Sequence, residues 1–521
     1  MKLHGLFPAG AVASRGDAGV ARLQEKLDAI PFENPVQAAR LLMLEFRRSV
    51  AGCDDLQSLF AHLEPVHRHA ERVLSPVEES LPTATLPLAP ALRQAIRAAD
   101  QLLKEIAAAY TDVCRRASGQ GATQGPSAPL HRALVRAMEL NARRLCLAHR
   151  AYVRGSVSAW DHLHRLYGLA VKEGFAAAAP DRESTSPEHL YVHALLLAYA
   201  GPTRFMPGEL DWARAYIERH GRLARLSPLA ADQPLPKTGP ASARFLVRPR
   251  RAQPEVLASG AASLPVEPGI AVLDCAPLVE HLRTQLTGVE QGGTPPVQLG
   301  LPTIAVQRDY RHFLHYLLSQ WSVPPHQRSH HLLFPPHADA VFGFERVWAF
   351  IDAQAAQPNA GALSAQGQAP EGLSQWSIVS QSLDGMGLRH LGGDSSRVRV
   401  GEVLAIRPRE RDMVIVCVAR RALNHRDDEL ELRVDELAVR AAALTISVAA
   451  GTGSRQERVL LLPALPTLNN AAGLVAMPGC VAPGTEIRLR DGARELLLRV
   501  DQRIERTGSC EIFTLAPASG D

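Results

Sequence analysis

The chain lacks the long apolar runs that mark membrane proteins. None of the hydrophobic stretches in its 521 residues approaches the ~20 residues that a helix needs to cross a bilayer. The N-terminus, Met-Lys-Leu-His-Gly-Leu-Phe-Pro, also lacks the sustained apolar region of a signal peptide. We therefore expect a cytoplasmic protein without a membrane span.

Cysteine is scarce, and its seven positions are scattered. No two of them form a Cys-x-x-Cys pair. Isolated cysteines are typical of a reducing compartment, and they argue against both a disulfide framework and a thiolate metal site. This pattern agrees with the cytoplasmic location expected from the missing signal peptide.

The chain has no block of charge of one sign. Its 57 Lys and Arg residues nearly balance 53 Asp and Glu residues, and they are spread along the chain. A nucleic-acid-binding protein gathers basic residues on one segment or face, so we expect no nucleic acid as a partner.

At ~100–200 residues per domain, the length predicts three or four domains.

Catalytic signatures are missing as well. The sequence has no Gly-x-Ser-x-Gly elbow, no Gly-x-x-x-x-Gly-Lys-Ser/Thr loop, no His-Glu-x-x-His and no Gly-x-Gly-x-x-Gly after a strand. These motifs supply a nucleophile, a phosphate cradle, a metal site and a dinucleotide site. We therefore expect no catalytic residues and no enzyme.

The first 225 residues have the periodicity of helices. Asn34 followed by Pro35 is the start signal of one helix. After Pro90, apolar residues recur at spacings of three and four as far as Val113, which is the pattern of a packed amphipathic helix. Further helices are expected after it, so residues 1–225 should form an α-helical domain, either a bundle or a superhelix of antiparallel hairpins.

Residues 226–325 form a linker and an intermediate α/β segment. The first 40 or so residues are rich in Pro, Ala and Gly, which is typical of a linker. A short apolar strand is expected next, at 269–274, and helices are expected at 276–286 and 307–321. We expect this segment to dock the helical part on the C-terminal part of the chain.

From residue 326 onwards the hydrophobic period changes to two. Residues 376–388 begin as a strand and break into a turn rich in small residues, where glycines let another backbone or a flat ligand come close. Strands are expected at 398–406, 413–421 and 429–438, and the stretch 355–372, rich in Ala, Gln, Gly and Pro, is expected to be an inserted loop.

This order of strands resembles the PilZ domain, a six-stranded barrel that commonly serves as a receptor for cyclic di-GMP. Ser380-x-Ser382-x-x-Gly385 is similar to the family's Asp/Asn-x-Ser-x-x-Gly turn, with Ser380 in place of the leading Asp or Asn. The strands after this turn are similar to the family's next two strands. The resemblance covers roughly a quarter of the chain and implies a PilZ-like β-barrel over residues 326–447.

A second block of strands occupies residues 448–521. A strand is expected at 458–462, and strands at 486–490 and 495–500 flank Asp491-Gly492, a hairpin turn signal. A last strand at 511–515 closes a second small β-barrel. The whole chain is therefore expected to be α+β, with a helical N-terminal half followed by tandem small antiparallel β-barrels.

The resemblance also implies a ligand site. In PilZ receptors, two arginines of an Arg-x-x-x-Arg segment ahead of the barrel bind phosphate and guanine through their guanidinium forks. Here Arg328 is the one arginine of that segment, and the second position falls on Leu332 or, in the alternative register, on His331. Losing one such contact should cost ~1–3 kcal/mol in affinity.

The resemblance therefore implies that Arg328, with His331 as a weak substitute, contacts phosphate and guanine, while Ser380, Ser382 and Gly385 line the guanine side. It implies a bacterial, non-enzymatic regulatory protein with cyclic di-GMP as its ligand, no other cofactor, and a protein partner reached through the helical half. The incomplete arginine motif leaves an alternative, a PilZ-like scaffold or adaptor that does not bind nucleotide.

The histidines near the barrel start raise the question of a metal site. His326, His330, His331 and His337 lie close to Asp339, and imidazole with carboxylate suits zinc. The flanking prolines predict a loop instead of a helix that would align the imidazoles. We therefore expect exposed loop histidines and no bound metal.

Overall fold

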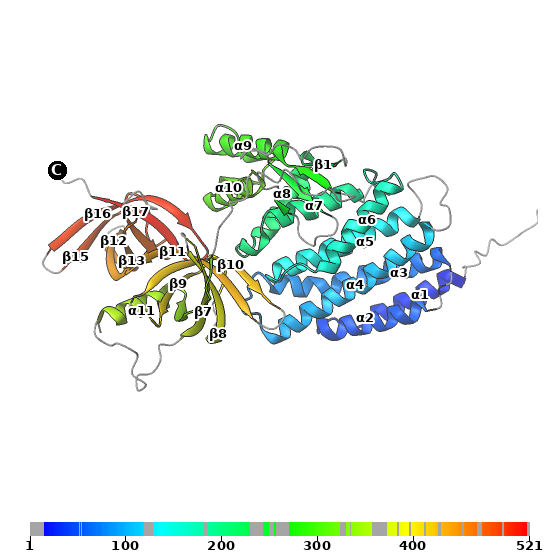
Figure 1. The fold of residues 1–521 in the computed structure, drawn as a ribbon, viewed down its shortest axis with the longest axis horizontal. Coiled ribbons are helices and arrows are strands. Elements are labelled where there is room, and N and C mark those ends of the chain that lie inside the picture. Colours follow the sequence, from blue (N-terminus) through cyan, green and yellow to red (C-terminus); the bar gives the residue numbers. More distant parts are fainter. Residues whose placement is uncertain are drawn as a thin grey trace, which may run out of the picture.

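The computed structural model describes residues 15–51, 53, 55–118, 129–181, 185–229, 243–248, 255–256, 270–322, 330–333, 335–356, 372–382, 385–394, 398–410, 413–425, 429–450, 453–465, 471–491 and 494–517. Within these ranges the chain is helical up to residue 223 and mostly β from residue 330 onwards (Figure 1). A mixed α/β segment lies between the two parts.

Helices form the N-terminal half, and local signals mark their ends. The expected start at Asn34 is confirmed, because its Oδ1 accepts hydrogen bonds from Val36 N and Gln37 N at 3.0 and 3.2 Å. No helix in the described part of the chain is both long and apolar enough to cross a membrane. The elements are α1 (Arg15–Asp28), α2 (Pro35–Val50), α3 (Leu56–Ser80), α4 (Pro90–Ser118), α5 (Pro129–Arg150), α6 (Val157–Lys172), α7 (Pro187–Tyr199), η1 (Pro202–Arg204), α8 (Glu209–His220) and η2 (Gly221–Leu223).

Successive helices of this half lie side by side, from α2 through α3, α4 and α5 to α6 (Figure 1). The seam expected after Pro90 is confirmed, since Ala99, Leu103, Ile106 and Tyr110 are fully buried on α4. One face of each helix thus contributes to a continuous apolar core.

The intermediate segment packs against α7 and α8, and this places its last helix beside the barrels. The ring of Phe313 lies 5.7 Å from that of Phe205 and 5.6 Å from that of Trp212. Trp321 Nε1 donates a 3.0 Å hydrogen bond to Leu196 O. The sheet order is β1-β4-β2-β3. The elements are β1 (Arg225–Pro228), β2 (Arg244–Val247), β3 (Glu255–Val256), β4 (Ala271–Asp274), α9 (Ala276–Glu290), η3 (Pro296–Leu299), η4 (Thr303–Val306) and α10 (Arg308–Ser322).

The next strands close into a six-stranded barrel. The sheet runs β7-β6-β9-β10-β11-β8, and β8 pairs again with β7, so no edge is left open. The short strand β5 also pairs with β7, beyond the point where β6 ends. The elements are β5 (His330–His331), β6 (His337–Phe342), β7 (Ser374–Ser382), β8 (Gly385–Gly393), β9 (Val403–Pro408), β10 (Ile415–Asn424) and β11 (Leu430–Val439).

A helix between β6 and β7 departs from the expected run of strands. α11 (Phe344–Ala356) buries Val347 and Ile351 on one side, which a period of two does not produce. A period of two does not predict this helix, because its apolar face is short and lies between two strands. Of the expected loop at 355–372, residues 357–371 lie outside the described residues.

The last six strands form a second antiparallel sheet in the order β12-β13-β14-β17-β16-β15. Its two edge strands approach each other, which makes it a nearly closed barrel. The expected hairpin is confirmed by the pairing of β15 with β16, from Glu486 opposite Arg499 to Asp491 opposite Arg494. The strands are β12 (Ala442–Ala450), β13 (Gly453–Leu465), β14 (Ala471–Ala476), β15 (Glu486–Asp491), β16 (Arg494–Arg506) and β17 (Glu511–Pro517).

These sheets confirm the α+β class with two β-barrels after a helical half. Strand β12 spans the boundary placed at residue 447, and the division at 225, 325 and 447 stays a prediction. The two barrels share an apolar core, to which α11 contributes Val347, the first barrel Val416 and the second barrel Leu460. The barrels are therefore packed against each other as well as being consecutive in the chain.

The helical half is attached to the first barrel at the end of β10. Asn424 N donates to Tyr152 O at 2.7 Å, and Asn424 Nδ2 donates to Ala151 O at 2.8 Å. A second attachment joins Arg399 Nη2 to Thr83 O at 2.8 Å. Both contacts tie loops between helices of the N-terminal half to the barrel.

Candidate functional site

The turn between β7 and β8 organises the candidate site. Ser382 Oγ donates to Gly385 O at 3.1 Å, which holds the two ends of the turn together. The same hydroxyl accepts a 2.6 Å hydrogen bond from Arg433 Nη2, on the neighbouring strand β11. Of the residues expected at the site, Ser382 and Gly385 thus lie in direct contact, and Arg433 joins them.

Arg328 lies outside the described residues. For His331 the structure describes the backbone, which lies opposite Ser380 in the pairing of β5 with β7. The segment ahead of the barrel therefore ends in a short strand, where the prolines had predicted a loop. Pairing with β7 overrides the local sequence signal, because an unpaired edge of β7 offers hydrogen bonds.

The histidines considered for a metal site are also described only in part, because His326 and the side chains of His330 and His331 lie outside the described residues. His337 and Asp339 lie on β6, and the carboxylate of Asp339 is held by Arg407 Nη2 at 3.4 Å and Arg409 Nη2 at 3.1 Å. Two arginines thus occupy the carboxylate that a cation would need. No group of three or more metal-ligating side chains occurs among the residues that the structure describes.

The two glycines after the turn have different neighbours. A Cβ on Gly385 would lie 2.0 Å from Val434 O, so the backbone of β11 fills the space that a side chain would take. A Cβ on Gly387 would lie 2.4 Å from Ser380 Oγ, so this glycine makes room for a hydroxyl. The expectation that another backbone comes close is met at Gly385.

A row of residues crosses the outer face of the barrel. Strand pairing places Ser380 opposite Gly387, Gly387 opposite Arg433, and Arg433 opposite Arg421. The strand neighbours Leu388, Leu432 and Val434 are buried in the barrel. Because side chains alternate along a strand, the members of the row lie on the face away from the barrel core, where Ser380 and Gly387 are buried, Arg433 is half-buried and Arg421 is exposed.

A β-bulge sends two consecutive arginines to this outer face. The pairing of β10 with β11 shifts register between Ala419 and Arg421, and both Ala419 and Ala422 are buried in the core. In a regular strand Arg420 and Arg421 would point to opposite faces. The bulge adds one residue to β10, so both side chains point to the outer face.

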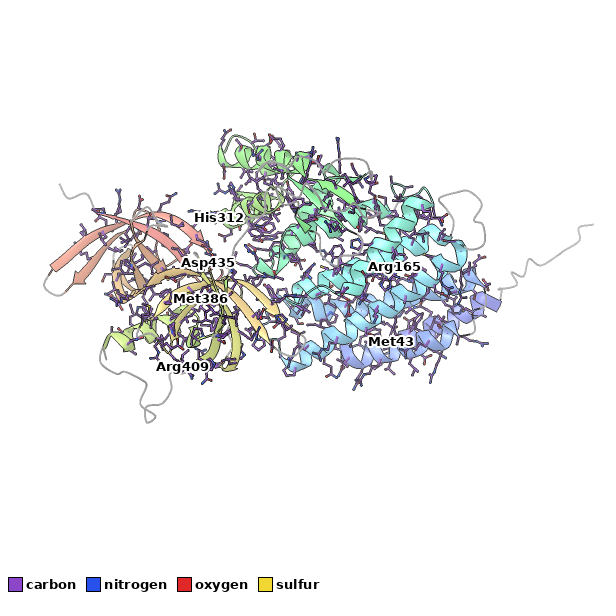
Figure 2. All side chains as sticks on the ribbon, in the orientation of Figure 1. Met43, Arg165, His312, Met386, Arg409 and Asp435 are labelled. Atoms are coloured by element: carbon purple, nitrogen blue, oxygen red, sulfur yellow. The ribbon has the colours of Figure 1, made fainter. Side chains whose placement is uncertain are left out.

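The row opens into a cleft of about 270 Å³ between the barrels and the helical half. One wall comes from η1, α8 and α10, and the other from β10 and β11, with Glu505 and Arg506 of β16 at the edge. Figure 2 labels His312 of α10 and Asp435 of β11, which both line this cleft, where α10 meets the first barrel.

Arg420 is fixed by carboxylates within the cleft. Its Nε donates to Asp435 Oδ2 at 3.0 Å, and its Nη2 donates to Glu505 Oε2 at 2.7 Å, while Nη1 also contacts Glu505. Against the desolvation of burial, the carboxylates of Glu505 and Asp435 raise the pKa of Arg420. This arginine thus fastens the second barrel to the first.

Arg421 and Glu209 face the same cleft and have shifted pKa values. Partial desolvation, and then the charges of Arg204 and Arg154, lower the pKa of Arg421. Burial raises the pKa of Glu209 to about 7. The cleft therefore gathers positive charge, and the raised pKa of Glu209 means that this carboxyl takes up a proton near neutral pH.

The sequence did not identify Arg204, Arg421 or Arg433 as site residues. Arg421 stood in a strand that carried the resemblance, but nothing marked its side chain as outward. Arg433 follows a period of two like any exposed strand residue. Strand register places Arg433 beside Ser382 and Arg421 opposite Arg433, whereas the docking of η1 brings Arg204 to the cleft.

Two family models match the chain. The N-terminal domain of the cyclic-di-GMP receptor FimW matches residues 21–232, and the FimW C-terminal beta-barrel domain matches residues 441–517. The first barrel lies between the two matched ranges. No curated protein and no solved structure matches the chain closely enough to count as a relative.

Proposed function

Because the chain belongs to the FimW family of cyclic-di-GMP receptors, we propose that its first barrel is the receptor module. The ligand binds on the outer row formed by Ser380, Gly387, Arg433 and Arg421, next to the turn at Ser382. The protein acts as a non-enzymatic effector that passes the bound state to a protein partner through its helical half.

The contact between Arg433 and Ser382 is the observation that carries this proposal. It joins a guanidinium to the hydroxyl of the turn that resembles the PilZ motif, at 2.6 Å. Arg433 Nε is buried and has no hydrogen-bond partner in the described structure. The guanidinium is thus oriented by one contact, and it lines the cleft, where its terminal nitrogens can donate to phosphate or to the O6/N7 edge of guanine.

Arg433 and Arg421 also answer the objection from the incomplete arginine motif. The segment ahead of the barrel has one arginine, Arg328, where the family pattern has two. The barrel itself offers two further guanidinium groups, on directly opposed positions of β10 and β11. We expect them to restore the ~1–3 kcal/mol that the missing contact would otherwise cost.

In this proposal Ser380 and Ser382 face the guanine, and Arg328 and His331 approach from the segment ahead of the barrel. Gly385 contributes by letting β8 and β11 pair closely, since β11 fills the space beside it. Gly387 makes room for the Ser380 hydroxyl in the middle of the row.

The route to the partner follows the attachments of the barrel. β10 carries Arg420 and Arg421 and ends at Asn424, which is bonded to Ala151 and Tyr152 of the helical half. A ligand that displaces β10 therefore acts directly on the loop between α5 and α6. This continuity supports the helical half as the surface that the partner reads.

Calorimetric titration of the full chain with cyclic di-GMP tests the proposal. We expect binding by the natural protein and a tenfold to hundredfold weaker affinity in Arg433→Ala and in Ser382→Ala, since each removes a charge-assisted or turn contact worth ~1–3 kcal/mol. Arg409→Ala is the control, because Arg409 lies on the same barrel but pairs with Asp339 away from the row (Figure 2). No heat of binding by the natural protein would favour the scaffold that binds no nucleotide.

A further inference from the structure

We propose that the helical half supplies part of the ligand site. Arg204 of η1 and Tyr316 of α10 face Arg421 and Arg433 across the cleft, and a cyclic dinucleotide bound between these walls clamps the helical half to the first barrel. The proposal rests on the proposed function, and it adds residues outside the barrel to the site.

The two walls of the cleft come from segments far apart in the chain. Arg204 and Tyr316 belong to the helical and intermediate segments, whereas Arg421 and Arg433 belong to the barrel, and all four line one cavity. At about 270 Å³, the cavity is smaller than the ~300–1,000 Å³ pockets that enclose a whole drug-sized ligand. It therefore takes one end of the dinucleotide, and the other end lies along the row towards Ser382.

The charge of the lining suits a dianion. Five arginines and three carboxylates line the cavity, which leaves two net positive charges when all are ionised. Two of the carboxylates, Asp435 and Glu505, already pair with Arg420. The third, Glu209, adds a further net positive charge whenever it is protonated.

Arg421 is the barrel cation best placed for a ligand. In the described part of the chain it makes no hydrogen bond and no ion pair, and its side chain is exposed. The nearby charges of Arg204, Arg154 and Arg433 oppose its own. A bound phosphate relieves this repulsion and receives two-pronged hydrogen bonds, so the like charges become an advantage once an anion arrives.

An aromatic wall faces this charge. Tyr316 is half-buried, its hydroxyl donates to Gly201 O at 3.5 Å, and its ring lies 5.9 Å from that of Phe205. Gly201 adopts φ of +68°, and a Cβ there would lie 3.0 Å from the Tyr316 hydroxyl. The ring is thus held in place on the cleft wall, where a purine can stack on it.

Ligand binding is then coupled to the arrangement of the helical half relative to the first barrel. A ligand held by Arg421 alone would reach the helical half only through the attachment of β10 at Asn424. A ligand held also by Arg204 and Tyr316 adds bonds between the halves and restrains η1 and α10. The ligand then works as a bridge whose presence the helical half registers directly.

The test is calorimetric titration of the full chain with cyclic di-GMP, using Arg204→Ala, Arg204→Lys and Arg421→Ala. We expect a tenfold or greater loss of affinity in both alanine variants and an intermediate loss in Arg204→Lys, which keeps the charge but not the fork. Arg165→Ala is the matched control, because Arg165 is an exposed arginine of the helical half that lies on α6, away from the cleft (Figure 2). Thermal unfolding of each variant checks that it is folded.

Amide hydrogen exchange with and without cyclic di-GMP gives a second readout. We expect the ligand to slow exchange in η1 and α10 of the natural protein, and this slowing to disappear in Arg204→Ala at saturating ligand. Binding that depends on Arg433 and Ser382 but not on Arg204 would overturn the clamp and leave the receptor function intact. Failure of the natural protein to bind would overturn both.

Discussion

A series of three glycine substitutions on one strand tests how the turn at Ser382 is built. Gly385, Gly387 and Gly392 all lie on β8, but their surroundings differ. A Cβ would meet the β11 backbone at 2.0 Å from Gly385 and the Ser380 hydroxyl at 2.4 Å from Gly387, whereas nothing lies within 4 Å of Gly392. Alanine at these positions should therefore have three different effects.

The size of each effect can be worked out from the contacts. In Gly385→Ala, β8 and β11 must separate by about 1 Å to bring the Cβ even to 3.0 Å from Val434 O. Overpacking costs ~1–3 kcal/mol and each weakened ladder hydrogen bond ~0.5–1.5 kcal/mol, so we expect a loss of about 2–5 kcal/mol. In Gly387→Ala, the Ser380 hydroxyl can rotate away, so the loss should stay near ~1 kcal/mol.

Gly392→Ala should be neutral or should stabilise the strand by ~0.5–1 kcal/mol, because alanine loses less backbone entropy than glycine. Amide hydrogen exchange of peptides from β8 and β11 measures the local stability of this pair of strands. Equal protection in Gly385→Ala and Gly392→Ala would refute the steric argument. Loss of ligand binding in Gly387→Ala with a stable barrel would assign that glycine to the ligand face.

Three further predictions concern charge. Burial lowers the pKa of His149 to about 4 from 6.5. As pH drops, the unfolded chain therefore binds a proton before the folded chain does. The free energy of unfolding, measured by urea denaturation, should fall by up to ~3 kcal/mol between pH 6.5 and pH 4. His149→Gln should flatten that slope, and an unchanged slope would contradict the assignment. Burial, helped by Asp309, raises the pKa of Glu209 to about 7. Because ionised Glu209 repels the dianion, affinity for cyclic di-GMP should weaken as pH rises through 7. Calorimetry on Glu209→Gln should show a weaker dependence of affinity on pH. The side chains of Arg420 and Glu505 are 29% and 25% exposed. A double-mutant cycle, read by hydrogen exchange in β16, should give a coupling free energy of about 1–2 kcal/mol between them. Additive effects of the two substitutions would refute the link between the barrels.

Local patterns were enough to predict most of the elements. The cap at Asn34 and the seam along α4 act between residues a few positions apart, so the sequence states them directly. The hairpin around Asp491 is equally local. The sequence did not predict α11. This helix is short and lies between strands, where a period of three to four is difficult to separate from a period of two.

The site was predicted only in part. The sequence marked the turn of Ser382 and Gly385, because small residues after a strand end are a local signal. It sought the second guanidinium in the segment around Arg328, where the PilZ resemblance places it. Arg433 is 51 positions away from Ser382, and no spacing rule connects them.

By itself, then, the sequence determined the helical half, the tandem barrels and the position of the turn, since periodicity and turn chemistry depend on neighbouring residues. The tertiary structure alone decided which cations gather at that turn and in the cleft beside it. Strand register sets Arg433 beside Ser382 and opposite Arg421, a bulge sends Arg420 and Arg421 to the same face, and the docking of η1 brings in Arg204. Each of these depends on pairing and packing between distant segments, whose free energy is gained only when the whole chain has folded.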